Sequence, residues 1–65
     1  MNENEKEIFN EIMTYLKDTY NVKSINKDGT MTLSLGKQNL GEIQLSNTLI
    51  YNINEVCKII TSEMS

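Results

Sequence analysis

The segment Asn26-Lys27-Asp28-Gly29-Thr30 decides how this chain folds, because it is the strongest turn signal among its 65 residues. A glycine that follows an Asx-x-Asp sequence is typical of a type I turn closed by a glycine bulge, the common three-residue connection of a β-hairpin. In that register Asn26 pairs with Thr30 and Ile25 pairs with Met31. We therefore predict two antiparallel strands, one on each side of this segment.

The strand after the turn is amphipathic. Its residues alternate between an apolar face and a polar face, which are Met31, Leu33 and Leu35 on one side and Thr30, Thr32 and Ser34 on the other. In the strand before the turn, Val22 has the opposite parity from Ile25. That strand therefore either carries a bulge or exposes Val22.

A second polar turn, from Gly36 to Gly41, precedes a third alternating segment. Ile43 and Leu45 alternate there with polar residues, which predicts a third strand. The apolar run 49–51 is either a fourth strand or the approach to a helix, and the sequence leaves this choice open.

Two segments have helical periodicity. The first carries Ile8, Ile12, Leu16 and Tyr20 at intervals of four, with Phe9 and Met13 widening the apolar stripe. It predicts a helix over about 5–19, begun by a capping box of Asn4 with Glu7 and ended by Asn21, which tolerates the left-handed conformation.

The second helix is predicted over about 53–63. Asn52 and Glu55 repeat the capping-box spacing. The apolar stripe of this helix comprises Ile53, Val56, Cys57, Ile60 and Met64. Because Cys57 lies within the stripe, we expect it to be a small buried side chain.

The order helix, three or four strands, helix predicts a single α+β domain over residues 1–65, a small two-layer fold in which an N-terminal and a C-terminal helix cover an antiparallel sheet. This order resembles that of the double-stranded-RNA-binding domain. That family has a His in its hairpin loop and a Lys-Lys pair at the start of its second helix, whereas this loop is Asn26-Lys27-Asp28-Gly29 and the second helix has only Lys58. The resemblance is therefore confined to the order of elements.

Missing residue types exclude several chemistries. The chain has no His and no Arg, so it lacks a proton carrier near neutral pH, an imidazole metal ligand and a bidentate phosphate fork. Its one cysteine, Cys57, cannot form an internal disulfide. The acidic start and the lack of an apolar run longer than 49–51 are unlike a signal peptide or a membrane span. We expect no enzymatic activity, no cofactor, no metal site, no membrane contact and a cytoplasmic location.

The net charge of −3 is concentrated in the first helix, because residues 1–20 carry −3, residues 21–51 carry +1 and residues 52–65 carry −1. A solvated polar face explains this pattern in most proteins. The functional interpretation is a negative patch that docks on a basic protein surface. The predicted partner-binding residues are Glu3, Glu7, Glu11 and Asp18 for electrostatic docking, with Leu40 and Tyr51 as apolar anchors.

These observations favour a small non-enzymatic protein-protein interaction module. Abundant Asn, Ile and Lys with no Arg or Ala indicate an A+T-rich coding sequence, as in a low-G+C bacterium or its phages. The most concrete hypothesis is a phage or mobile-element inhibitor of a host enzyme, such as a defence nuclease. Further apolar side chains are expected on the surface, namely Val22, Leu40 and Ile59.

Two alternatives remain. One is a weak nucleic-acid-binding module that uses Lys23, Lys27 and Lys37. The other is a homodimeric scaffold, because a short chain without disulfides or metal ligands gains stability from association.

Overall fold

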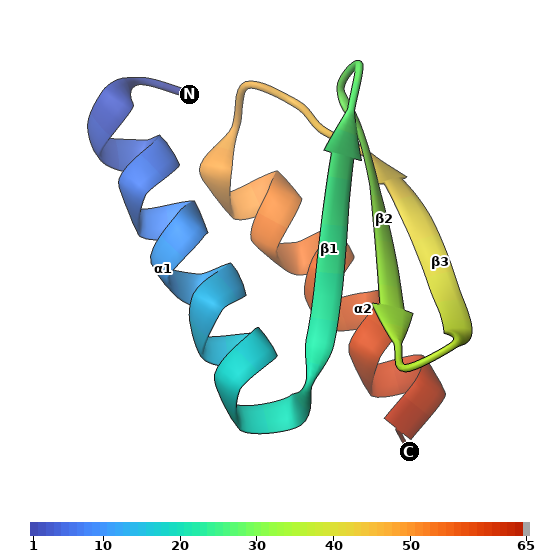
Figure 1. Cartoon of the computed structure of the whole chain (residues 1–65). Helices are drawn as coiled ribbons and strands as arrows, with labels where there is room; N and C mark the ends of the chain where they lie inside the picture. Colours follow the sequence, from blue (N-terminus) through green and yellow to red (C-terminus); the bar gives the residue numbers. More distant parts are fainter. Residues whose placement is uncertain (65) are drawn as a thin grey trace.

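The computed structural model describes residues 1–64, and the side chain of Met64 lies outside the description, as does its predicted place in the apolar stripe. The chain forms α1 (Glu3–Tyr20), β1 (Val22–Lys27), β2 (Thr30–Leu35), β3 (Gln38–Gln44) and α2 (Leu49–Met64) (Figure 1). The predicted α+β class is therefore confirmed, with three strands. Residues 49–51 form the first turn of α2, which is longer than predicted.

The sheet has the order β1-β2-β3 with antiparallel neighbours, and both helices pack against the same face of it. Helix α1 lies along β1, and α2 lies along β3 (Figure 1). Among the described residues, the buried apolar core consists of Phe9, Met13, Val22, Met31, Leu33, Leu40, Ile43 and Val56. Of the helices described, none covers the opposite face of the sheet, which we call the open face.

The β1-β2 hairpin turns through two residues and not the predicted three. Lys27 pairs with Thr30, and the loop is Asp28-Gly29 with φ angles of 52° and 80°. Two consecutive left-handed residues are what a type I′ turn requires, and this turn is favoured because its twist matches that of the strands. The predicted register was wrong by one residue.

This shift exchanges the two faces of β1, because side chains alternate along a strand. Val22 pairs with Leu35 and is 1% exposed, whereas Ile25 pairs with Thr32 and is 67% exposed. The expectation that Val22 lies on the surface was therefore wrong. The predicted apolar and polar faces of β2 are confirmed, since Met31 and Leu33 are buried.

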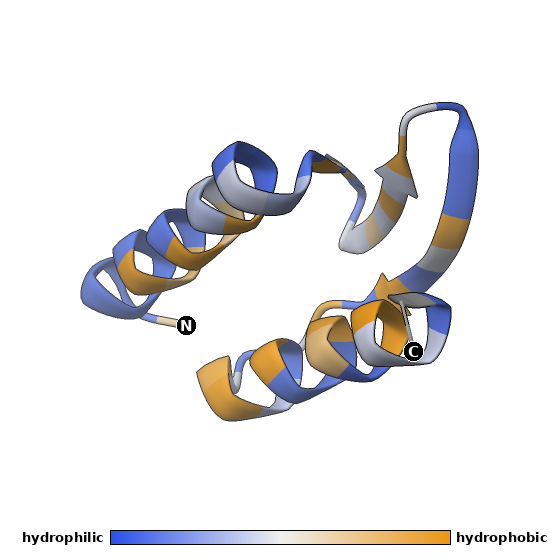
Figure 2. Ribbon diagram, turned by 90° about the horizontal axis from the view of Figure 1, so that it is seen from below, coloured by the Kyte–Doolittle hydropathy of each residue, from blue (hydrophilic) through white to orange (hydrophobic). Residues whose placement is uncertain are grey.

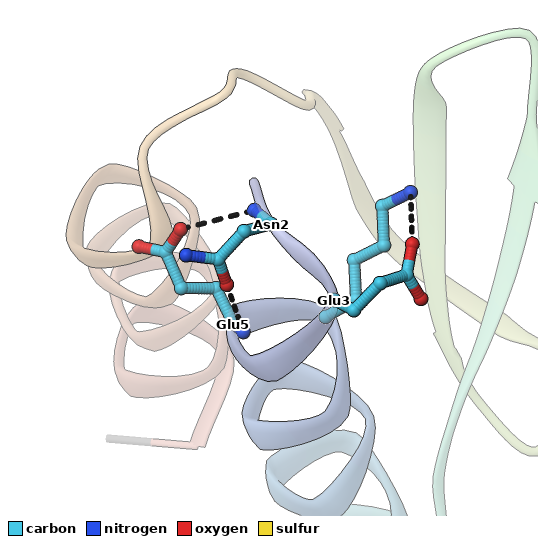
Figure 3. A network of polar contacts seen from close by, with 4 residues as sticks. Asn2, Glu3 and Glu5 are labelled. Atoms are coloured by element: carbon cyan, nitrogen blue, oxygen red, sulfur yellow. Dashed lines mark hydrogen bonds and ion pairs between the residues drawn. The ribbon is translucent and has the colours of Figure 1, made fainter.

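Helix α1 begins earlier than predicted, at a capping box formed by Asn2 and Glu5 (Figure 3). Asn2 Oδ1 accepts a hydrogen bond from the Glu5 N–H at 2.8 Å, and Glu5 Oε1 accepts one from the Asn2 N–H at 3.1 Å. Asn4 and Glu7 have the same spacing, but the earlier pair gives a longer helix with more backbone hydrogen bonds. The predicted end of the helix is confirmed, because Asn21 has φ 60°.

Asn52 was predicted to cap the second helix, and this prediction was wrong. It lies inside α2 and is 0% exposed. Its amide binds Ser46 in the loop between β3 and α2, and Nδ2 also contacts Met1 Sδ at 3.6 Å. A buried amide needs such partners, since an unsatisfied one costs about 1–3 kcal/mol. Asn52 thus ties this loop and the start of the chain to α2.

A bulge interrupts β3. Leu33 pairs with Gly41 and Ser34 pairs with Asn39, so Leu40 is the extra residue. Its side chain is only 8% exposed and packs in the core. Ile59 of α2 is also partly buried against the core. The predictions that Leu40 and Ile59 lie on the surface were therefore wrong.

Candidate functional site

Three carboxylates form a row along the outer side of α1. Glu7, Glu11 and Asp18 are exposed and lie within about 40° of one line on the helix, at about 100° per residue. We call them the acidic row. In the part of the chain that the structure describes, the ion pairs are Glu3 with Lys6 and Glu55 with Lys58, so no cation neutralises the row.

The fourth predicted acidic residue, Glu3, lies one turn before Glu7. Its carboxylate is 3.6 Å from Lys6 Nζ (Figure 3), and both side chains are well exposed to solvent. An exposed pair of this kind contributes little to stability. The structure therefore brings the four predicted acidic residues onto one helix, with three of them unpaired.

An apolar groove separates α1 from α2, and we call it the inter-helix groove. Its volume is about 130 Å³, and it is lined by Phe9, Ile12, Leu16, Ile53, Val56, Cys57, Ile60 and Thr61. Phe9 and Val56 are buried and form its floor, whereas Cys57 and Thr61 are exposed at its rim. Apolar cavities of about 150 Å³ hold a benzene-sized group, so the groove fits one large apolar side chain.

The groove exists because α1 has two adjacent apolar rows. Phe9 and Met13 are buried against the sheet, whereas Ile12 lines the groove and the exposed Ile8 lies between Ile12 and the acidic row. Figure 2 shows hydrophobic bands that recur along both helices. The sequence pattern predicts this wide stripe, but it does not show which of its residues the sheet covers.

Further exposed apolar side chains extend this surface. On the α1 side they are Ile8 and Tyr15, and at the start of α2 Ile50 is 64% exposed. Scattered apolar residues on a surface are normal, but a continuous apolar patch with a polar rim is typical of a binding site. The helix layer therefore presents an apolar groove, and Ile8 and Tyr15 separate it on α1 from the acidic row.

The other predicted anchors lie elsewhere. Tyr51 is exposed on α2 but does not line the groove. Leu40, the bulge residue of β3, is buried in the core. Cys57 was predicted to be buried, but it is exposed and lines the groove. The second helix carries more apolar residues than the sheet covers, which explains this difference.

The three candidate nucleic-acid lysines do not form one patch. Lys23 and Lys27 stand on the open face at opposite ends of β1, about 13 Å apart at about 3.3 Å per residue. Lys37 lies in the β2-β3 turn, at the same end of the sheet as Lys23. No more than two of the three can therefore contact a ligand closely at one end.

Among residues 1–64 no helix is long and apolar enough to cross a bilayer, and no three His, Cys, Asp or Glu side chains gather as metal ligands. Comparison with known proteins finds no family model, no curated protein and no solved structure that matches this chain. The geometry of its own surface therefore carries any functional argument.

Proposed function

We propose that this chain is a small protein-binding module that docks through its helix layer. The inter-helix groove receives an apolar side chain of the partner, and the acidic row pairs with basic residues farther along the partner's surface. The observation that carries the proposal is that the helix layer has both an apolar groove and, on the outer side of α1 beyond Ile8 and Tyr15, three carboxylates without cation partners among the described residues.

The exposed apolar side chains of the folded chain support this proposal. Apolar side chains such as Ile8 and Ile50 contribute to the exposed area. Covering them with a partner is favourable, at roughly 25 cal/mol for each Å² of apolar surface.

The acidic row is expected to act on association rate and on partner choice more than on the strength of the final complex. Exposed charges attract a basic surface over about 10 Å at 0.1 M salt, and added salt screens this attraction. A partner with an apolar side chain among lysines or arginines fits both features. The basic nucleic-acid groove of another protein has this chemistry.

The finer form of the proposal is a cytoplasmic inhibitor, encoded by a phage or mobile element of a low-G+C bacterium, that covers the nucleic-acid groove of a host enzyme such as a defence nuclease. Its support is the A+T-rich codon signature, the small size and the net charge of −3. The chain itself is proposed to have no enzymatic activity, because it lacks the His and Arg side chains that commonly carry catalysis.

Two other functions have less support. A homodimer through the helix layer brings together two copies of the same acidic row, which repel each other. Nucleic-acid binding by Lys23, Lys27 and Lys37 is weakened by their separation at the two ends of the sheet.

The experiment compares capture of partners by the tagged wild-type chain and by two variants, from a lysate of its source cell with and without nuclease treatment. Cys57→Glu places a charge at the exposed rim of the groove. Asn39→Glu adds the same charge on β3, where the side chain is exposed and away from the groove. We expect a partner at near-equal amount that Cys57→Glu loses and Asn39→Glu retains.

Equal recovery by both variants would refute docking through the helix layer. Recovery of nucleic acid alone, lost on nuclease treatment, would favour the lysines. A concentration-dependent mass of two chains by light scattering, with no other partner, would favour the scaffold.

A further inference from the structure

A polar trough runs between α1 and the free edge of β1, on a different side of the molecule from the inter-helix groove. Two grooves of about 530 and 390 Å³ adjoin there and share Asn10, Met13 and Ser24. Ser24 and Asn26 have the same parity as the buried Val22, yet both are exposed because α1 does not cover them. We call this region the β1 trough.

The backbone of β1 has unpaired groups at this edge. The Leu45 N–H donates to the Gly29 carbonyl at 2.8 Å, so the N–H and C=O of the next residue, Thr30, face β1 and not β3. Thr30 pairs with Lys27, so the backbone groups of Lys27 bond to β2. Because these groups alternate in direction along a strand, those of Ile25 and Lys23 also bond to β2. The N–H and C=O of Ser24 and Asn26 therefore point outward to the free edge.

The two edges of the sheet differ in how well they are protected. The outer strand β3 carries the bulge at Leu40, which hinders the addition of another strand. In contrast, β1 pairs with β2 over six consecutive residues without a bulge. It therefore offers a regular edge on which a partner strand can form backbone hydrogen bonds.

The charges around this edge are positive on a chain whose net charge is negative. Lys17 and Lys23 line one groove of the trough without ion-pair partners among the described residues. Lys6 lines the other groove in its ion pair with Glu3, and Lys27 lies at the end of the strand, followed by Asp28 in the turn. Within residues 1–64, no carboxylate lines either groove. The local field therefore favours an anionic ligand, in contrast to the field of the acidic row.

We propose that the β1 edge binds an extended acidic segment of a partner protein as a fourth strand of the sheet. Side chains directly opposite each other in a sheet share a face, so the register specifies the ligand. Acidic residues stand opposite Lys23 and Lys27, and an apolar residue stands opposite Ile25. Small polar residues stand opposite Ser24 and Asn26. The resulting template, Glu-Thr-Ile-Thr-Glu, is palindromic, so it places the same residues opposite β1 in either strand direction.

Other occupants fit less well. A second copy paired antiparallel about Ile25 would set Lys23 against the Lys27 of the other copy, and like charges directly opposite are destabilising. Single-stranded nucleic acid binds such grooves by stacking its bases on aromatic rings, but the aromatic residue that lines the trough among the described residues, Phe9, is buried. Phosphates also accept hydrogen bonds without donating, so they leave the outward carbonyls of β1 unsatisfied.

The test uses the blocked heptapeptide Thr-Glu-Thr-Ile-Thr-Glu-Thr, the same peptide with Lys in place of Glu, and oligothymidylate, each titrated into ¹⁵N-labelled chain at low salt. We expect the Glu peptide to shift the amides of Ser24 and Asn26 and to slow their hydrogen exchange. Its affinity should exceed that of the Lys peptide by about tenfold or more. Oligothymidylate binding at these amides in place of the Glu peptide would overturn the proposal.

Two matched variants test the backbone contact. Ser24→Pro removes an N–H that points outward and bonds to nothing in β2, so the sheet keeps its ladder, as prolines on edge strands do. We expect it to abolish binding of the Glu peptide, whereas Ser24→Ala, which keeps the N–H, binds as wild type. Equal binding by both variants would refute strand addition.

A charge exchange keeps the proposal testable if Ser24→Pro does not fold. The double variant Lys23→Glu, Lys27→Glu is expected to prefer the Lys peptide over the Glu peptide. An unchanged preference would refute the proposed register. Because the Cys57→Glu variant leaves the trough intact, this binding is expected to survive even if docking through the helix layer fails.

Discussion

The side-chain amide of Asn52 binds both backbone groups of Ser46. Asn52 Oδ1 accepts from the Ser46 N–H at 2.8 Å, and Asn52 Nδ2 donates to the Ser46 carbonyl at 3.0 Å. Ser46 Oγ adds a third bond to the same Oδ1 at 3.2 Å. The amide thus pairs with the loop as a neighbouring strand would, which fixes the direction in which the chain leaves β3 and enters α2.

Replacing Asn52 should therefore destabilise the whole fold. Asn52→Leu has a similar volume but leaves the N–H and C=O of Ser46 without their partner, and we expect a loss of about 2–4 kcal/mol in the free energy of unfolding. Asn54→Leu on the exposed side of the same helix should change it by no more than about 0.5 kcal/mol. Urea denaturation followed by circular dichroism measures both, and equal losses would contradict this role.

The register of the hairpin predicts opposite effects at two positions on β1. Val22→Thr buries a hydroxyl in the core and should cost about 1–3 kcal/mol in the free energy of unfolding. Ile25→Thr, on the open face, should change it by less than about 0.5 kcal/mol. The same denaturation measurement tests this pair. A larger loss for Ile25→Thr would restore the three-residue hairpin connection that the sequence suggested.

The type I′ turn makes a prediction of its own. Gly29 has φ 80°, so Gly29→Ala should destabilise the chain by about 1 kcal/mol. Asp28 has φ 52°, and Asp28→Asn should stabilise it by a few tenths of a kcal/mol, since Asn-Gly is the preferred sequence of this turn. Thermal unfolding by calorimetry resolves the first change, and a Gly29→Ala variant as stable as wild type would argue against this turn.

Charge reversal in the acidic row should slow association with a captured partner. Glu7→Lys with Glu11→Lys is expected to lower the association rate by about tenfold at low salt and to reverse its salt dependence, with a smaller effect on dissociation. Surface plasmon resonance at two salt concentrations measures both rates. An unchanged rate and salt dependence would show that the row is only a solvated face.

The fold could be predicted from the sequence because its signals are local. The periodicity of Ile8, Ile12 and Leu16, the end of α1 at Asn21 and the alternation after Thr30 each depend on near neighbours. The exact hairpin register could not be predicted, because Asp28-Gly29 fits a two-residue and a three-residue connection, and the choice depends on which face of β1 packs against α1.

The candidate sites were only partly predictable. The acidic residues of α1 were identified from the sequence, but the inter-helix groove was not, because periodicity cannot tell how much of an apolar stripe the sheet covers. Cys57 illustrates this limit, since it belongs to the stripe of α2 and yet is exposed. The free edge at Ser24 and Asn26 was hidden by the error of one residue in the register.

Substitutions in the two apolar rows of α1 have different consequences. Phe9 and Met13 pack against the sheet, so substitutions there destabilise the folded state and are selected against. Ile8 and Ile12 stand beside them on the same helix but outside that constraint, so they are free to vary with the shape of whatever they contact. Substitutions at Ile8 and Ile12 can therefore change the exposed surface of α1, one at a time, without a change in the core.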